Sequence, residues 1–394
     1  MNKKLFKSLG KLIAVLAVAL TVIVIAGGVR VHADNGETVR VSTAKELKAA
    51  IKNADVGTII FRTKAFLNVT IKADKAAKGK SLIIDAENAV ITNKAVFADI
   101  NIYSAKQYIE SVSGNNISLS DAYMTDGLIV SKKKKVKSLT VYDSYDTFYT
   151  NYTIRKGAKI SAIEWIYAGD ESPVKSKYNK DKKQLTIEYT NDGCEHSYTA
   201  KFDKDGRMTK ITSESNWPEY NYIESTTYDS NGNAVKYTGE ENSSGNYTTE
   251  ITYSGDKMIK SVYKGDYESG TYTYTYDKKG NVIRAEFYGT GSVDGDSYES
   301  ASVWDYEYDK KGRLTYDRWE DPEYGNFYES SYTYNSKGFM TETFNNSSGS
   351  ESVYKYKYNK AGDLVERKYS SEGFKETNSY EYDELGELLE ESVG

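Results

Sequence analysis

The sequence predicts a mainly β protein, with an antiparallel array of β-hairpins over residues 151–394 and a small β-rich module over 34–150 that carries one capping helix. Three observations support this class. A tyrosine-containing motif recurs through the second half of the chain, its strands alternate polar and apolar residues, and only 3 of the 394 residues are proline. Self-similarity of this kind marks a repeat array in which each unit is one supersecondary element.

The repeated motif is Tyr-x-Tyr-(Asp/Asn)-x-x-Gly-x-apolar, and weaker copies occupy 200–208 and 228–234. The full copies start at Tyr274, Tyr306, Tyr332, Tyr356 and Tyr380. Their glycines at 280, 312, 338, 362 and 386 are therefore 32, 26, 24 and 24 residues apart. Asp or Asn followed three residues later by glycine is typical of a type I turn that continues into a left-handed glycine, which closes a hairpin with a G1 bulge.

This turn predicts which residues face each other across each hairpin. In the first full copy, Tyr276 should lie opposite Val282 and Tyr274 opposite Arg284. The same register pairs an aromatic with an aliphatic residue at Tyr308–Leu314, Tyr334–Met340, Tyr358–Leu364, Tyr382–Leu388 and Phe202–Met208. Because the alternate residues are polar, one face of the sheet is expected to be covered. We expect the array to curve or close with the tyrosine face inside.

Residues 1–33 have the pattern of a cleaved signal peptide: four lysines, an apolar run over 12–26, and a small-x-small site ending at Ala33. The alternative is an uncleaved membrane anchor. Cleavage predicts a secreted, extracellular protein, in part associated with the cell surface, with no membrane span after cleavage. Removing five of the 52 basic residues leaves 47 against 57 acidic ones, a net charge of −10, which argues against a nucleic-acid partner.

The N-terminal module combines one helix with short strands. Thr43 and Glu46 form a capping box for a helix over 44–54. The strands are expected at 38–41, 58–62, 67–71, 81–84, 89–92, 99–103, 116–119 and 128–131. The order resembles the start of a right-handed β-helix of the pectin-lyase-like class, in which the helix caps the solenoid. That resemblance implies a β-helical module, and we see no catalytic set that matches the family's enzymes.

The hairpin motifs resemble RHS/YD repeats over about residues 178–394, and the copy at 306–314 has the full Tyr-x-Tyr-Asp-x-x-Gly-Arg-Leu pattern. The resemblance implies an exported, surface-facing β structure with carbohydrate or partner binding. The chain lacks the length and the self-cleaving module of the toxin-enclosing members. Its spacing is also longer than is usual for the family.

Few residues offer catalytic chemistry. Cys194 and His196 are the lone cysteine and the lone histidine after residue 33, too few ligands for a metal site or a nucleophile–base pair. We therefore predict a protein that is not an enzyme, with no catalytic residues, no metal and no cofactor. A run of lysines, Lys132–Lys135 with Lys137, predicts a solvated hairpin tip, or alternatively contact with an anionic polymer or membrane surface.

Aromatic residues between repeats are the better candidates for ligand binding. Two similar segments contain them: Trp217, Tyr220 and Tyr222 in the first, and Trp319, Tyr324 and Tyr328 in the second. Flat rings stack on sugars while amides and carboxylates bind hydroxyls. Alternatively, the rings cover the ends of the tyrosine layer. We predict non-catalytic binding of carbohydrate or a cell-envelope polymer; the alternatives are a polysaccharide lyase or hydrolase using the β-helical module, and a structural or adhesive protein that binds a surface protein.

Overall fold

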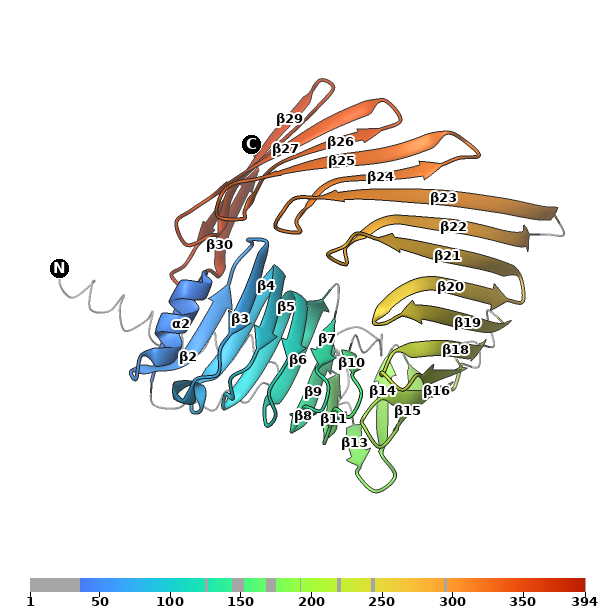
Figure 1. Ribbon diagram of the computed structural model, residues 1–394, viewed down its shortest axis with the longest axis horizontal. Helices are drawn as coiled ribbons and strands as arrows, with labels where there is room; N and C mark the ends of the chain where they lie inside the picture. Colours follow the sequence, from blue (N-terminus) through green and yellow to red (C-terminus); the bar gives the residue numbers. More distant parts are fainter. Residues whose placement is uncertain are drawn as a thin grey trace.

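The computed structural model describes residues 36–124, 127–143, 152–167, 175–191, 193–217, 221–241, 245–293 and 296–393. The signal peptide predicted at 1–33 lies outside them. An N-terminal β-solenoid of about five turns is followed by an 18-stranded antiparallel sheet, the hairpin array. Figure 1 shows the array fanned in an arc from one end of the solenoid back to the other. The predicted fold class, mainly β with a hairpin array and one capping helix, is confirmed.

The solenoid is built from short parallel strands. They are β1 (Glu37–Val41), β2 (Val56–Arg62), β3 (Leu67–Ile71), β4 (Ser81–Asn93), β5 (Asp99–Glu110), β6 (Asn116–Met124), β7 (Leu128–Val130), β8 (Lys135–Val136), β9 (Ser138–Asp143), β10 (Tyr152–Ile154), β11 (Lys159–Ile160) and β12 (Ile163–Tyr167). A 3-10 turn, η1 (Lys75–Ala77), precedes β4. Strands β10–β12 pair with β7, β8 and β9, so the solenoid continues past the expected boundary at 150.

Helix α2 (Ala44–Lys52) caps the first turn of the solenoid. The predicted capping box is present, since the Thr43 side chain accepts from the backbone of Glu46 and the Glu46 carboxylate accepts from the backbone of Thr43. Leu47, Ala50 and Ile51 are buried because their spacing places them on one helical face. The helix therefore covers apolar residues that would otherwise be exposed at the open end of the solenoid.

Ladders of aliphatic side chains stabilise the solenoid interior. Leu82, Ile100, Ile117, Leu139 and Ile163 occupy matching positions on β4, β5, β6, β9 and β12, and each is at most 2% exposed. Alternate residues on the same strands point outward, as the two-residue period of a strand requires. One face of these strands thus forms the core, and the other forms an outer surface of the solenoid.

The hairpin array is a meander in which each strand pairs with the next. Its strands are β13 (Lys175–Asn179), β14 (Gln184–Asn191), β15 (Cys194–Phe202), β16 (Met208–Ser215), β17 (Tyr222–Tyr228), β18 (Ala234–Glu241), β19 (Gly245–Ser254), β20 (Lys257–Gly265), β21 (Glu268–Tyr276), β22 (Val282–Val293), β23 (Asp296–Tyr308), β24 (Leu314–Asp321), β25 (Asn326–Tyr334), β26 (Met340–Ser347), β27 (Ser350–Tyr358), β28 (Leu364–Ser371), β29 (Phe374–Tyr382) and β30 (Leu388–Val393).

The predicted turn is present, and its glycines, such as Gly280 with φ 97°, have positive φ. The predicted cross-strand pairs nearest the turns are confirmed. Tyr276 faces Val282, and the five other aromatic–aliphatic pairs are also present. The predicted pairing of Tyr274 with Arg284 was wrong by one residue, because Tyr274 faces Ala285 and Thr275 faces Arg284. The bulge adds one residue to the second strand, which shifts every later pair.

The tyrosine face of the array is half-buried, not an enclosed core. Beyond Ile211, the buried apolar side chains of the described residues are Ala285 and Phe339. The first strands are different, since Leu185, Ile187, Tyr198 and other side chains of β14–β16 join the solenoid core. Burial still affects the tyrosines, and it raises the pKa of Tyr334 to about 12. The sheet is curved as predicted, but a single layer leaves its tyrosine face partly accessible.

Hairpin turns of the array dock on both ends of the solenoid. Near its last turns, the backbone N–H groups of Lys156 and Ile160 donate to the carbonyls of Asn231 and Asp205, at 3.1 and 2.9 Å. Near its first turns, the N–H of Phe66 donates to Gly338 at 3.0 Å. The array therefore leaves one end of the solenoid and returns to the other (Figure 1).

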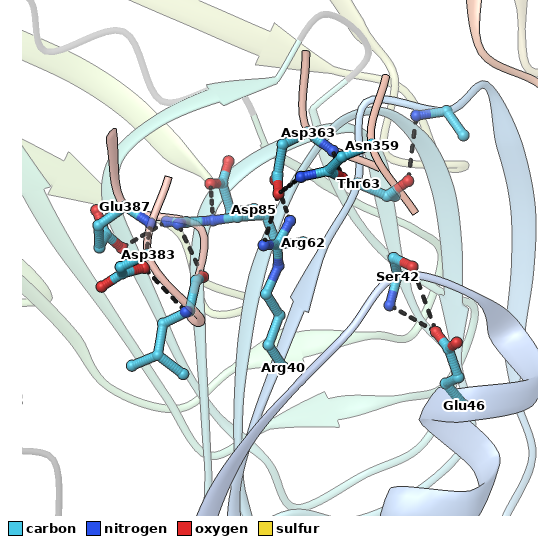
Figure 2. A network of polar contacts seen from close by, with 12 residues as sticks. Arg40, Ser42, Glu46, Arg62, Thr63, Asp85, Asn359, Asp363, Asp383 and Glu387 are labelled. Atoms are coloured by element: carbon cyan, nitrogen blue, oxygen red, sulfur yellow. Dashed lines mark hydrogen bonds and ion pairs between the residues drawn. The ribbon is translucent and has the colours of Figure 1, made fainter. Parts of the chain in front are cut away.

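Polar contacts join the last hairpins of the array to the first strands of the solenoid (Figure 2). Arg40 on β1 binds both carboxylate oxygens of Asp363, whose side chain also accepts from Asn359. Arg62 on β2 pairs with Glu387 at 2.9 Å and donates to the carbonyl of Leu385 at 3.1 Å. We use the name clasp for Arg40, Arg62, Asp363 and Glu387, which join elements more than 300 residues apart in sequence.

Candidate functional site

The two predicted aromatic segments do not converge on one site. Trp217 lies between β16 and β17 and is 43% exposed, Tyr222 begins β17, and Tyr220 lies outside the described residues. Trp319 lies within β24, not in a loop, and Tyr328 lies in β25. Six strands of the same sheet lie between β17 and β24, so the two are about 34 Å apart along the sheet at normal strand spacing.

The second segment contributes to a continuous aromatic row across the array. Trp304 faces Trp319, and Trp319 faces Tyr328, on three neighbouring strands. Tyr272 extends the cluster, with its ring 6.3 Å from that of Trp304 and 4.6 Å from that of Phe287. Tyr324, which lies in the adjoining turn, is 71% exposed. Trp304 was not among the predicted binding residues, because it lies inside β23 and outside the paired loop motif.

A polar row lies next to the aromatic row on the same face. Asp317 faces Ser330, which faces Asn345. The hydroxyl groups of Tyr328 and Ser330 donate to the Asn345 Oδ1 at 3.1 and 2.9 Å. These groups therefore satisfy one another, and an added ligand would compete with bonds already made.

A groove on the outer surface of the solenoid is a better candidate binding site than the aromatic row, because it is a defined cavity. It has a volume of about 600 Å3, within the roughly 300–1,000 Å3 typical of small-molecule sites. Its lining comes from outward residues of β4, β5, β6, β9 and β12: Ser81, Ile83, Asp99, Asn101, Asn116, Ser118, Ser138, Thr140, Tyr142, Glu164 and Ile166, together with Leu82 and Ile100. These side chains stack in rows because the rungs are in register, as in Asn101–Ser118–Thr140–Glu164.

The chemistry of this groove is that of hydroxyl recognition. Hydroxyls and amides dominate its lining, Asp99 and Glu164 add carboxylates, and none of the lining residues that the structure describes is Lys, Arg or His. A strongly anionic ligand would find no counter-charge there. A neutral ligand with many hydroxyl groups matches the donors and acceptors of the lining.

Asn101 is a groove residue whose amide already contacts two neighbouring hydroxyls. Its side chain is 7% exposed, and its Oδ1 accepts from the Ser120 hydroxyl at 2.9 Å. Its Nδ2 is itself buried, and its N–H faces the Tyr103 hydroxyl. The Asn101 amide therefore helps to hold the groove together, and the hydroxyls of Ser118 and Thr140 in the same row are the more accessible groups.

The other residues considered for catalysis or metal binding are Cys194 and His196. Cys194 is buried and contacts the Ser215 hydroxyl at 2.9 Å, while His196 stacks near Tyr198 with ring centroids 6.3 Å apart. Within the described residues, no group of three or more His, Cys, Asp or Glu side chains is arranged to hold a metal ion. No helix in that part of the chain is long and apolar enough to cross a membrane.

Comparisons with known proteins leave the family open. No protein-family model matches the sequence, and no curated protein matches it. Among solved structures, a porin-like protein from Bacteroides uniformis is similar at 11% identity over 53% of this chain and 92% of that one, with a TM-score of 0.25. At that score the likeness supports no inference about fold or function. The β-helical resemblance is supported by the solenoid itself, whereas membership of the RHS/YD family stays a prediction.

Proposed function

We propose that the protein is a secreted, non-catalytic binding protein for a neutral carbohydrate or cell-envelope polymer, held in the solenoid groove. The observation that carries this proposal is the groove lining, in which the hydroxyls of Ser118 and Thr140 stack in register between Asn101 and Glu164. Several stacked rungs line the groove, which suits an extended ligand. The absence of basic residues from the lining favours a neutral polymer over a uronate or a phosphate.

The direct test replaces Thr140 by Val. Thr140→Val removes one hydroxyl from the groove lining but keeps the shape of the side chain, so the local packing is preserved. Retention of residues 34–394 on a panel of insoluble and immobilised neutral polysaccharides should weaken about tenfold, as expected for losing one hydrogen bond to the ligand. Thr70→Val is the matched control, because Thr70 is exposed on β3 and does not line the groove.

The aromatic row offers a second candidate site for the same ligand class. It is favoured by the direct register of Trp304, Trp319 and Tyr328, since neighbouring rings can stack on successive sugar units. Trp319→Ala separates the two sites, because it leaves the groove unchanged. Loss of retention in Trp319→Ala with normal retention in Thr140→Val would assign binding to the array.

The same assay distinguishes the other functional classes. Release of reducing or unsaturated sugar into the supernatant would identify a hydrolase or lyase, and Asp99 and Glu164 would then be the first residues to replace. Retention on no polysaccharide or cell-wall preparation would contradict carbohydrate binding and favour an adhesive or structural role.

A further inference from the structure

The solenoid stacks the lysine run of residues 132–137 on a second basic turn. Strands β7 and β8 pair with β10 and β11 at a constant offset of 24 residues, as in Val130–Ile154 and Lys135–Lys159. The N–H of Lys133 donates to the carbonyl of Lys156 at 3.2 Å, which holds the two turns together. Together the two turns bring seven lysines to one edge of the solenoid, which we call the lysine edge: Lys132, Lys133, Lys134, Lys135, Lys137, Lys156 and Lys159.

The lysine edge is not neutralised by its own rungs. The two basic turns themselves, residues 131–137 and 155–160, contain no Asp or Glu, and the next acidic residues along these rungs are Asp143 at the end of β9 and Glu164 in β12. All seven lysines except Lys134 are exposed, and among the described residues none of the seven has a carboxylate within ion-pair distance. Arg155 is already engaged by the side chains of Asn233 and Asp256.

The array turns beside this edge have carboxylates that are already occupied. Asp203 and Asp205 bind Arg207 at 2.6 and 3.6 Å. Asp229 accepts from the backbone of its own turn at Asn231 and Asn233. These acidic groups therefore stabilise their hairpins and leave the lysines without partners.

Stacked lysines repel one another in the free protein. Lys135 and Lys159 are directly in register on adjacent strands, an arrangement that lowers stability. An anion bound between them would remove this repulsion. Rung spacing of roughly 4.8 Å also presents the charges at short, regular intervals, which matches closely spaced charges along a chain.

We propose that the lysine edge binds a linear polyanion whose repeating charge is phosphate. The edge offers ammonium groups and no free guanidinium, and lysine acts as a point charge suited to phosphate, whereas planar carboxylate recognition favours arginine. This site is separate from the groove and uses the opposite charge chemistry. The negative charge of the remaining chain disfavours large polyanions such as duplex DNA, which would approach acidic surfaces as well.

The test measures binding of inorganic polyphosphate to residues 34–394 at low and at physiological salt. Lys132, Lys135, Lys156 and Lys159 are replaced together by Gln, and the matched control replaces Lys278, Lys279, Lys310 and Lys311, which are exposed on two hairpin turns. Both variants lose four charges. The lysine-edge variant should weaken binding about tenfold or more and flatten the salt dependence, while the control should change affinity by less than about threefold.

Circular dichroism and thermal melting verify that both variants are folded. Equal loss of affinity in the two variants would overturn the proposal, because binding would then follow net charge alone. Absence of polyphosphate binding by the unmodified protein at low salt would also overturn it. Equal or tighter binding of poly-glutamate, phosphatidylglycerol vesicles or duplex DNA would contradict it, and would assign the edge to a carboxylate polymer, a membrane surface or nucleic acid.

Discussion

The clasp between the first and last parts of the chain gives the sharpest prediction about stability. Arg40→Met removes the cation that binds Asp363, and the two side chains are only 7% and 6% exposed. The aliphatic part of Met fills much of the volume of the Arg side chain. The substitution therefore leaves a buried carboxylate whose remaining side-chain partner is Asn359.

The expected loss is large because the pair is buried. Removing one partner of a buried ion pair costs about 3–5 kcal/mol. Arg313→Met is the matched control, since Arg313 pairs with Asp309 within one hairpin turn and both side chains are more exposed, at 14% and 21%. That pair should contribute about 1 kcal/mol or less. Replacing Asp363 as well, in Arg40→Met/Asp363→Leu, should restore part of the loss.

Native-state hydrogen exchange measures the effect where it occurs. The amides of residues 338–387 should exchange faster in Arg40→Met, because the C-terminal hairpins open without unfolding of the solenoid core. Exchange in β5 and β6 should be unchanged. A loss of protection in Arg40→Met no greater than in Arg313→Met, or an even loss over the whole chain, would refute the assigned role of the clasp.

Three further predictions concern packing and pH. Gly232→Ala would place a Cβ 1.9 Å from the carbonyl oxygen of Ile154, so it should lower the melting temperature more than Gly255→Ala, where φ is also positive but nothing lies within 4 Å. Burial raises the pKa of Asp363, but hydrogen bonds and charge from Arg40 outweigh this and hold it below its ordinary value. The clasp should therefore be intact above about pH 4 and weaken as pH falls through the lowered pKa, with faster exchange of the same amides at acid pH. Ile100→Ala removes one rung of a fully buried ladder and should cost about 2–5 kcal/mol in denaturant unfolding, and a cost below 1 kcal/mol would contradict the assigned core.

Local turn chemistry explains how much of the array could be predicted. Asp277 and Gly280 determine one loop, and the first aromatic–aliphatic pair follows directly from it. The second pair was missed because the extra residue of the bulge, at 283, shifts the register beyond the turn. Prediction therefore held for contacts that one turn fixes and failed one step further along the strands.

The candidate binding sites could not be located from the sequence, because they are formed by residues that are far apart in it. Trp217 and Trp319 lie in similar sequence segments, yet Trp217 lies in the loop before β17 and Trp319 lies within β24, seven strands further along the sheet. The groove was not predicted, although its outward polar residues alternate with the buried ladder on every rung. Such alternation shows that a residue points outward, but it does not show which outward residues of different rungs stack.

The sequence by itself determined the hairpin class, the capped helix and the lysine run, because each depends on residues within one turn or one helix. Only the tertiary structure decided the groove, the stacked lysine edge and the clasp. The spacings between ladder residues 82, 100, 117, 139 and 163 are 18, 17, 22 and 24, so no fixed period reveals the register of the rungs. The clasp joins residues 323 apart, and such a contact forms only when the curvature of the whole array returns its last hairpins to the first strands of the solenoid.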